Sequence, residues 1–220
     1  MEKRIKCVAA GLDFTLIHFL DPAERGLFNI FRKRGVSESD INAAFTEAMK
    51  RRFSIDTIVN LVTVMSGRVF TTSDREEIRA ESEKWFESFV SYPDSIPFLQ
   101  KYWGEIPIAI VTHGDQDFQR KKVYAAHVPY DDLRVVTPPK RKVEVLAELL
   151  ERYGKPVIFM EDNPHELDNA WHRFGPENVI TILVTRNDGV YGEKQPQYEH
   201  IKVVSLNEVD LLIERGGWWL

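Results

Sequence analysis

The sequence has little cysteine and no long apolar run. Cys7 is the only cysteine in 220 residues, which excludes an internal disulfide and a thiolate metal cluster. This scarcity fits a reducing compartment, so we expect a cytoplasmic protein. No apolar stretch approaches the ~18 residues that span a bilayer, and the first one ends at Asp13, too early for a signal peptide. We therefore expect no membrane association.

The sequence also lacks an excess of basic residues. Its 29 Lys and Arg against 34 Asp and Glu give a net charge of -5, which argues against nucleic acid as a partner. There is no phosphate-binding Walker loop, no Gly-x-Gly-x-x-Gly, no Gly-x-Ser-x-Gly and no zinc-binding helix motif, so a nucleotide cofactor is not supported. We expect a monomer or homodimer that binds a small molecule.

Six short apolar or β-branched runs predict strands that are buried on both faces, as in a parallel sheet. Helical patterns lie between most of these runs, and two of the helices should end at Gly154 and Gly175. This alternation is typical of a doubly wound, Rossmann-like α/β domain. The expected strands are 5–11, 106–112, 133–136, 156–161, 179–185 and 201–204.

The interval between the first two expected strands is different. It is about 90 residues long, shows several helical segments and no convincing strand, and exceeds what a strand-to-strand crossover needs. One of its helices is expected to start with a capping box at Ser73 and Glu76. We therefore expect an all-helical cap over residues 18–90, inserted into an α/β core of residues 1–17 and 91–220.

Polar side chains follow the expected strands at the points where they end. Because carboxyl ends of parallel strands share one edge, where ligands of α/β sheets bind, these groups should converge. Lysine and threonine can hold a phosphate there, beside a magnesium ion held by carboxylates. The candidates are Asp13, Thr112, His113, Lys140, Lys142, Asp162 and Glu166.

The order and spacing of these groups resemble the haloacid dehalogenase (HAD) superfamily, in particular its phosphatase-like members with a helical cap. The stretch "IKCVAAGLDFTL" is similar to the family's first motif, Asp-x-Asp-x-Thr-Leu, with Gly11 in place of the first Asp. Thr112 matches the second motif. Lys140 is the better match to the third-motif lysine and Lys142 the alternative, while "VIFMEDNPHELDNA" looks like the fourth motif, with Asp162 and Glu166.

The resemblance implies a role for each matched residue. The residue at position 11 would be the nucleophile that forms an aspartyl-phosphate, and Asp13 would act as acid and then base. Thr112 and Lys140 would hold phosphoryl oxygens, with His113 as a further binding candidate. Asp13, Asp162 and Glu166 would hold magnesium. The three magnesium-binding candidates also have structural explanations. Asp13 can cap a turn, and Asp162 and Glu166 can stabilise the N-terminus of the helix that follows them.

Gly11 departs from this pattern, because it has neither a nucleophile nor a metal-binding carboxylate. Asp13 could instead be the nucleophile, with Thr15 in the acid/base place, or the glycine could be an engineered substitution. Magnesium should be held weakly or not at all if Gly11 is native. We expect a HAD-like hydrolase acting on a small phosphate ester, with low or altered activity. The alternative is an inactive HAD-fold module that binds a phosphorylated ligand or a protein.

Overall fold

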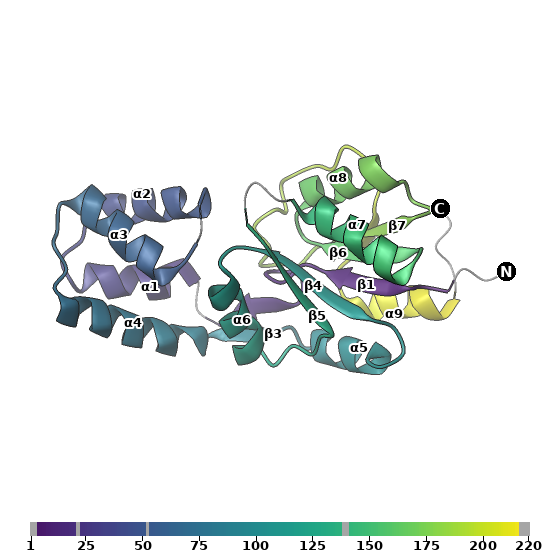
Figure 1. Ribbon diagram of the computed structural model, residues 1–220, viewed down its shortest axis with the longest axis horizontal. Coiled ribbons are helices and arrows are strands. Elements are labelled where there is room, and N and C mark those ends of the chain that lie inside the picture. Colours follow the sequence, from purple (N-terminus) through teal and green to yellow (C-terminus); the bar gives the residue numbers. More distant parts are fainter. Residues whose placement is uncertain (1–3, 21–22, 52, 138–140, 216–220) are drawn as a thin grey trace.

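A six-stranded parallel sheet forms the centre of the protein (Figure 1). The computed structural model describes residues 4–20, 23–51, 53–137 and 141–215. The strands lie in the order β5-β4-β1-β6-β7-β8, and every neighbouring pair is parallel. All six predicted strands are present, which confirms the Rossmann-like α/β fold class. Their bounds are β1 Cys7–Ala10, β4 Ile108–His113, β5 Asp132–Val136, β6 Val157–Glu161, β7 Val179–Val184 and β8 Ile201–Val203.

Helices cover both faces of the sheet, so its central strands are apolar at nearly every position. In β1, Cys7 and Ala9 pack in one apolar layer with α7 and α8, whereas Val8 and Ala10 pack in the other layer with α5, α6 and α9. Figure 1 shows α7 and α8 above the sheet, and α5 and α9 below it. The bounds are α5 Ser95–Tyr102, α6 Gln116–Ala125, α7 Lys142–Tyr153, α8 Pro164–Phe174 and α9 Leu206–Arg215.

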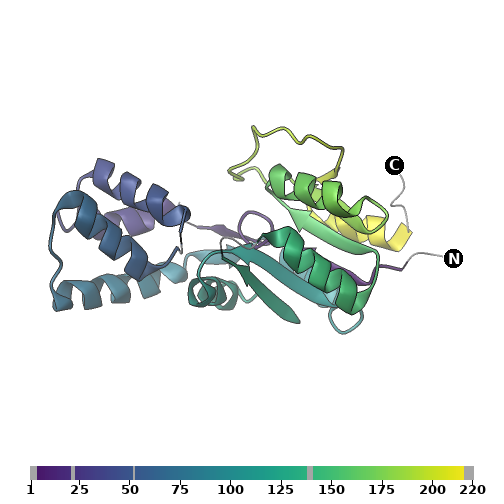
Figure 2. The same ribbon diagram turned by 45° about the horizontal axis from the view of Figure 1, so that its top comes forward.

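Four more helices lie between β1 and β4 in the sequence and form a bundle beyond the end of the sheet toward which β1 runs (Figures 1 and 2). The chain enters and leaves this bundle through β2 (Ile17–Phe19) and β3 (Phe89–Ser91), which pair antiparallel. The interval therefore contains two strands where we expected none, because three residues are too few to show a period. The helices are α1 Ala23–Arg32, α2 Glu38–Met49, α3 Ile55–Ser66 and α4 Thr72–Phe86.

The start of α4 corrects the predicted capping box. Thr71 is the N-cap, and its hydroxyl accepts a hydrogen bond from the backbone N–H of Asp74 while the Asp74 carboxylate accepts one from Thr71 N–H. Ser73 and Glu76 lie inside the helix. Two overlapping stretches have the spacing of a capping box, and the sequence alone did not distinguish them. The domain limits at residues 18 and 90 stay a prediction.

The single cysteine lies in the middle of the sheet. Cys7 is 0% exposed, and burial, with the nearby carboxylates of Asp132 and Asp131 as smaller causes, raises the pKa of its thiol to about 12. A thiol in this setting stays protonated and shielded from reagents at neutral pH.

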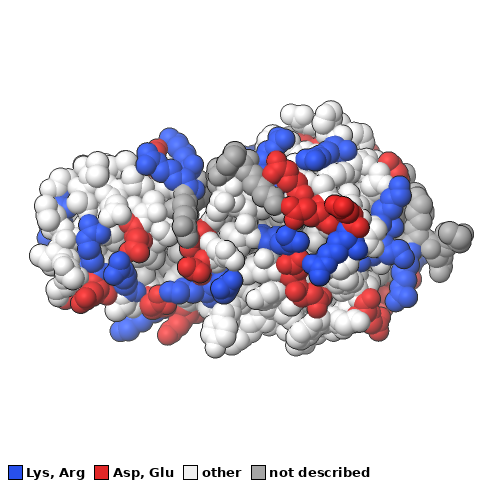
Figure 3. All heavy atoms as spheres, in the orientation of Figure 1, with Lys and Arg blue, Asp and Glu red and all other residues white. Residues whose placement is uncertain are grey.

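The surface carries charges of both signs. On the face shown in Figure 3, lysine and arginine side chains alternate with aspartate and glutamate over both the helical bundle and the sheet domain. Within the described ranges, no helix combines the length and the apolarity required to cross a bilayer.

Candidate active site

A tight turn after β1 places Asp13 at the carboxyl end of the sheet. Gly11 N–H donates to the carbonyl of Met160 at 2.8 Å, and the Leu12 carbonyl accepts from the N–H groups of Leu16 and Ile17. Phe14 adopts a positive φ of 55°, an uncommon conformation for a residue with a side chain. The turn therefore holds Asp13 in a fixed position at the end of β1.

Asp13 forms an ion pair with a buried lysine of α6. Lys122 Nζ lies 2.5 Å from Oδ1 and 2.6 Å from Oδ2 of Asp13, and the lysine side chain is 5% exposed against 31% for the aspartate. Burial lowers the pKa of Lys122, and the Asp13 carboxylate opposes that change. The sequence analysis missed Lys122, although its position four residues after the buried Phe118 on the same helix would have indicated an inward side chain.

A second buried ion pair lies at the end of β6. Lys142 Nζ is 2.5 Å from Oε2 of Glu161, and both side chains are almost fully buried. Burial lowers the pKa of Lys142, but the carboxylates of Glu161 and Glu166 outweigh it and hold that pKa above its usual value. Lys142 was the alternative third-motif lysine, whereas the preferred Lys140 lies outside the described residues.

Glu161 also approaches Gly11 closely. A Cβ atom at position 11 would lie 2.6 Å from Oε2 of Glu161 and 3.0 Å from Oγ1 of Thr15. Real Cβ atoms do not approach an oxygen to 2.6 Å, so the Glu161 carboxylate fills the space that a side chain at position 11 would occupy. We expected Glu161 at this edge as the last residue of its strand, but assigned the motif role to Asp162, the next residue.

Asp162 and Glu166 follow β6, as expected. Burial and the neighbouring Glu161 raise the pKa of Asp162 well above its usual value. Its Oδ2 has no hydrogen-bond partner. Burial raises the pKa of Glu166, but the hydrogen bond from His113, with Nε2 and Oε1 3.1 Å apart, outweighs it and the pKa lies below its usual value.

Thr112 lies near the end of β4, beside β1. The residue is buried, and its hydroxyl donates to Oε1 of Gln119 at 3.4 Å. Since β4, β1 and β6 are neighbours, the structure brings Thr112, Asp13 and Asp162 to one edge of the sheet.

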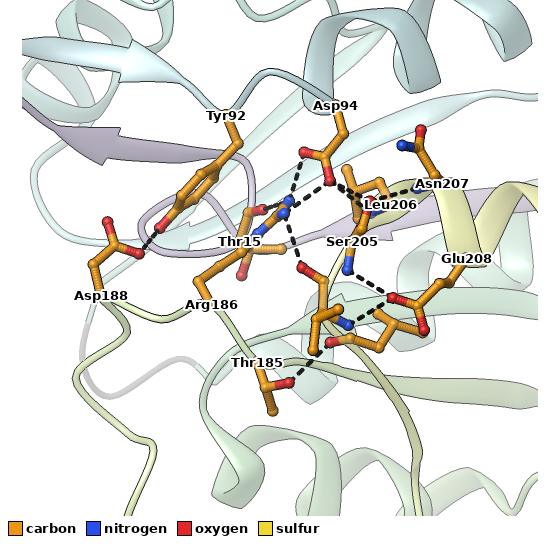
Figure 4. A network of polar contacts seen from close by, with 12 residues as sticks. Thr15, Tyr92, Asp94, Thr185, Arg186, Asp188, Ser205, Leu206, Asn207 and Glu208 are labelled. Atoms are coloured by element: carbon orange, nitrogen blue, oxygen red, sulfur yellow. Dashed lines mark hydrogen bonds and ion pairs between the residues drawn. The ribbon is translucent and has the colours of Figure 1, made fainter.

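A polar network fixes the far side of the first turn (Figure 4). Arg186 binds both carboxylate oxygens of Asp94, at 2.8 and 2.9 Å, and donates to the backbone carbonyl of Thr15 at 3.1 Å. The same Asp94 accepts from the Ser205 hydroxyl and from Leu206 N–H. This network ties the turn to the loops after β7 and β8.

Solved structures share this fold over almost the full chain. An L-2-haloacid dehalogenase aligns at a TM-score of 0.66 and 13% identity, covering 96% of this chain and 99% of its own. A HAD-like family hydrolase from Xanthomonas campestris aligns at 0.64 and 13% identity, covering 98% and 94%. The chain has the HAD-like fold.

The HAD-like fold is supported by a further structural neighbour. A 2-haloacid dehalogenase from Pseudomonas syringae pv. tomato aligns at a TM-score of 0.63 and 13% identity, covering 96% of this chain and 99% of its own. No family model matches the sequence, and no curated protein matches it either. Identities this low show the fold, and the chemistry has to be argued from the site.

Proposed function

We propose that this protein is a hydrolase of the HAD-like fold that cleaves a small phosphate ester where β4, β1 and β6 end. The observation that carries the proposal is the pair of buried ammonium–carboxylate contacts at this edge, Lys122 with Asp13 and Lys142 with Glu161. Phosphoryl transfer needs cations where charge spreads over the phosphoryl oxygens, and a proton donor beside the leaving oxygen.

Lys142 suits the first of these needs. A buried ammonium interacts more strongly with an anion than an exposed one does, because water screens it less. The hydroxyl of Thr112 can donate a second hydrogen bond from the neighbouring part of the edge. We therefore assign the phosphate-holding role to Lys142 and Thr112.

Asp13 and Lys122 suit the second need. Burial lowers the pKa of Lys122, which makes its proton easier to transfer, and the direct contact lets Asp13 pass that proton on. The pair would protonate the leaving oxygen and then accept a proton from water.

A tightly held magnesium ion does not fit the donor set. Among the described residues, no three His, Cys, Asp or Glu side chains form a group that could hold a metal. Lys122 occupies Asp13, and His113 contacts Glu166. Oδ2 of Asp162 and Oδ1 of Asp13 accept no hydrogen bond, and these two oxygens are too few to hold magnesium tightly. We therefore assign no step to a metal and propose that any magnesium binding is weak.

Assays of the purified protein test the proposal. We expect phosphate release from 4-nitrophenyl phosphate and from some members of a panel of small phosphate esters. Lys142→Met should lower that rate at least ~100-fold, whereas Lys202→Met, at an exposed position of β8, should leave it unchanged. A loss in Lys140→Met with full activity in Lys142→Met would move the phosphate-holding role to Lys140.

The same assays separate two other functions. L-2-Chloropropionate belongs in the panel because the names of two structural neighbours specify haloacids. Chloride release without phosphate release would show that the substrate is a haloacid and not a phosphate ester. Absence of both reactions would favour the alternative, a non-enzymatic module. Gly11 supports that alternative because it lacks the carboxylate of the motif. The single buried cysteine supports a reducing compartment such as the cytoplasm as the place of action.

A further inference from the structure

Gly11 and Glu161 are spatial neighbours whose sizes are complementary. The register of β1 with β6 pairs Ala10 with Met160, so positions 11 and 161 follow side by side at the ends of the two strands. Position 11 has no side chain, and the Glu161 carboxylate lies where that side chain would be. A carboxylate therefore lies beside position 11, but it belongs to Glu161 of the adjacent strand β6.

The surroundings of Glu161 are those of a functional group. Lys142 holds Oε2, while Oε1 has a long contact of 3.4 Å with the N–H of Asn163. The hydroxyl of Thr15 is fully buried without a hydrogen-bond partner, and it too lies against the space at position 11. A purely structural ion pair does not account for an unsatisfied hydroxyl at the same point.

We infer that Glu161 supplies the nucleophilic carboxylate that position 11 lacks. This inference rests on the proposed function. A carboxylate oxygen of Glu161 forms a bond to the substrate phosphorus, and the bond from phosphorus to the ester oxygen breaks. The leaving oxygen takes a proton from the Asp13–Lys122 pair. Water then attacks the phosphorus of the glutamyl-phosphate and gives a proton to that pair, and orthophosphate leaves as the Glu161 carboxylate is restored.

Melting temperatures test the complementarity without any activity. Gly11→Ala should lower the melting temperature of the native protein by about 3–8 °C, because the new methyl group collides with Glu161, which Lys142 holds in place. In a Glu161→Gly background the same change should cost little. Gly192→Ala is the matched control, since a Cβ there meets no atom within 4 Å. An equal loss of melting temperature in both backgrounds would show that Glu161 does not fill the space of a side chain at position 11.

Trapping of the intermediate tests the chemistry. Borohydride added during turnover reduces an acyl-phosphate, so mass spectrometry should find the reduced side chain at Glu161. Glu161→Gln should lower turnover at least ~1,000-fold, and Glu151→Gln, on the exposed side of α7, should not. The double variant Gly11→Asp/Glu161→Gly should regain part of the rate, because it returns a carboxylate to the same space.

The outcomes separate the inference from the proposed function. If the native protein releases phosphate while Glu161→Gln stays fully active, or if the reduced residue is Asp13, the role of Glu161 is overturned and the hydrolase remains. If the native protein releases no phosphate from any ester, both the proposed function and the role of Glu161 are wrong.

Discussion

Lys122 pairs with the Asp13 carboxylate, and donates a hydrogen bond to its Oδ2, from within an aromatic enclosure. Its Nζ lies 5.1 to 5.8 Å from the ring centres of Phe19, Phe89 and Phe118. These rings come from β2, β3 and α6, so the two short strands that join the helical bundle to the sheet also line the site. A cation in this enclosure is stabilised by the ring faces and by Asp13 together.

We predict that Lys122→Met lowers phosphate release by about 100-fold but changes the unfolding free energy by only about 1–2 kcal/mol. Methionine fills the enclosure, and Asp13 is exposed enough to regain water, whereas proton transfer loses its donor. Lys121→Met is the control, because Lys121 is the preceding residue and points to the surface. Full activity in Lys122→Met would remove this lysine from the mechanism.

Arg186→Leu should destabilise the protein by roughly 3 kcal/mol. It leaves the largely buried Asp94 without its cation and frees the carbonyl of Thr15. Urea unfolding measures the change. Arg152→Leu removes an exposed arginine 3.6 Å from Asp132 and should cost less than about 1 kcal/mol. Equal losses in the two variants would contradict a supporting role for the Arg186 network.

The stability of the protein should fall below about pH 6.5 through His200. Its Nδ1 lies 2.8 Å from the hydroxyl of Thr181 and its Nε2 3.0 Å from Asp168, and burial lowers its pKa despite the nearby carboxylate. The unfolded chain then binds more protons than the folded one as pH drops, so the contribution is complete above the unfolded pKa and is lost below it.

Melting temperatures from pH 7.5 to 5.0 measure this dependence. The decrease should be smaller in His200→Gln than in the native protein, and His165→Gln, at an exposed position, should match the native slope. An unchanged slope in His200→Gln would assign the acid sensitivity to other groups.

Magnesium titration should show weak binding, in the millimolar range or beyond. Lys122 pairs with Asp13, and the raised pKa of Asp162 makes its ionised form less favourable as a ligand. Calorimetry with the native protein and with Asp162→Asn measures the affinity. A micromolar dissociation constant that disappears in Asp162→Asn would show that the site rearranges around the ion.

The sheet could be predicted from the sequence because a strand buried on both faces reads as a continuous apolar run. The predicted ends of the strands then indicated that Asp13, Thr112 and Asp162 lie at one edge of the sheet. The three-residue strands β2 and β3 carry no period, and α3 reads "IDTIVNLVTVMS", whose β-branched residues do not favour a helix. Tertiary packing and the Ser54 N-cap outweigh that preference.

The partners of the site residues were harder to predict. Lys122 lies four residues after Phe118 on a helix and Glu161 ends an expected strand, but neither position identifies the partner of a charged side chain. What draws them inward is a contact with a residue far along the chain, Asp13 or Lys142. Gly11→Asp alone should not complete the site, because Glu161 occupies the space that the new side chain needs.

The buried thiol of Cys7 makes the native chain a convenient background for site-directed labelling. Maleimides react with thiolates at accessible sites, and a thiol with a pKa of about 12 at 0% exposure offers neither property. A cysteine introduced at an exposed position of the helical bundle, such as Val64, would therefore be the single reactive thiol of the folded protein. A fluorophore there would test whether the bundle moves against the sheet when a ligand is added, with no need to remove the natural cysteine first.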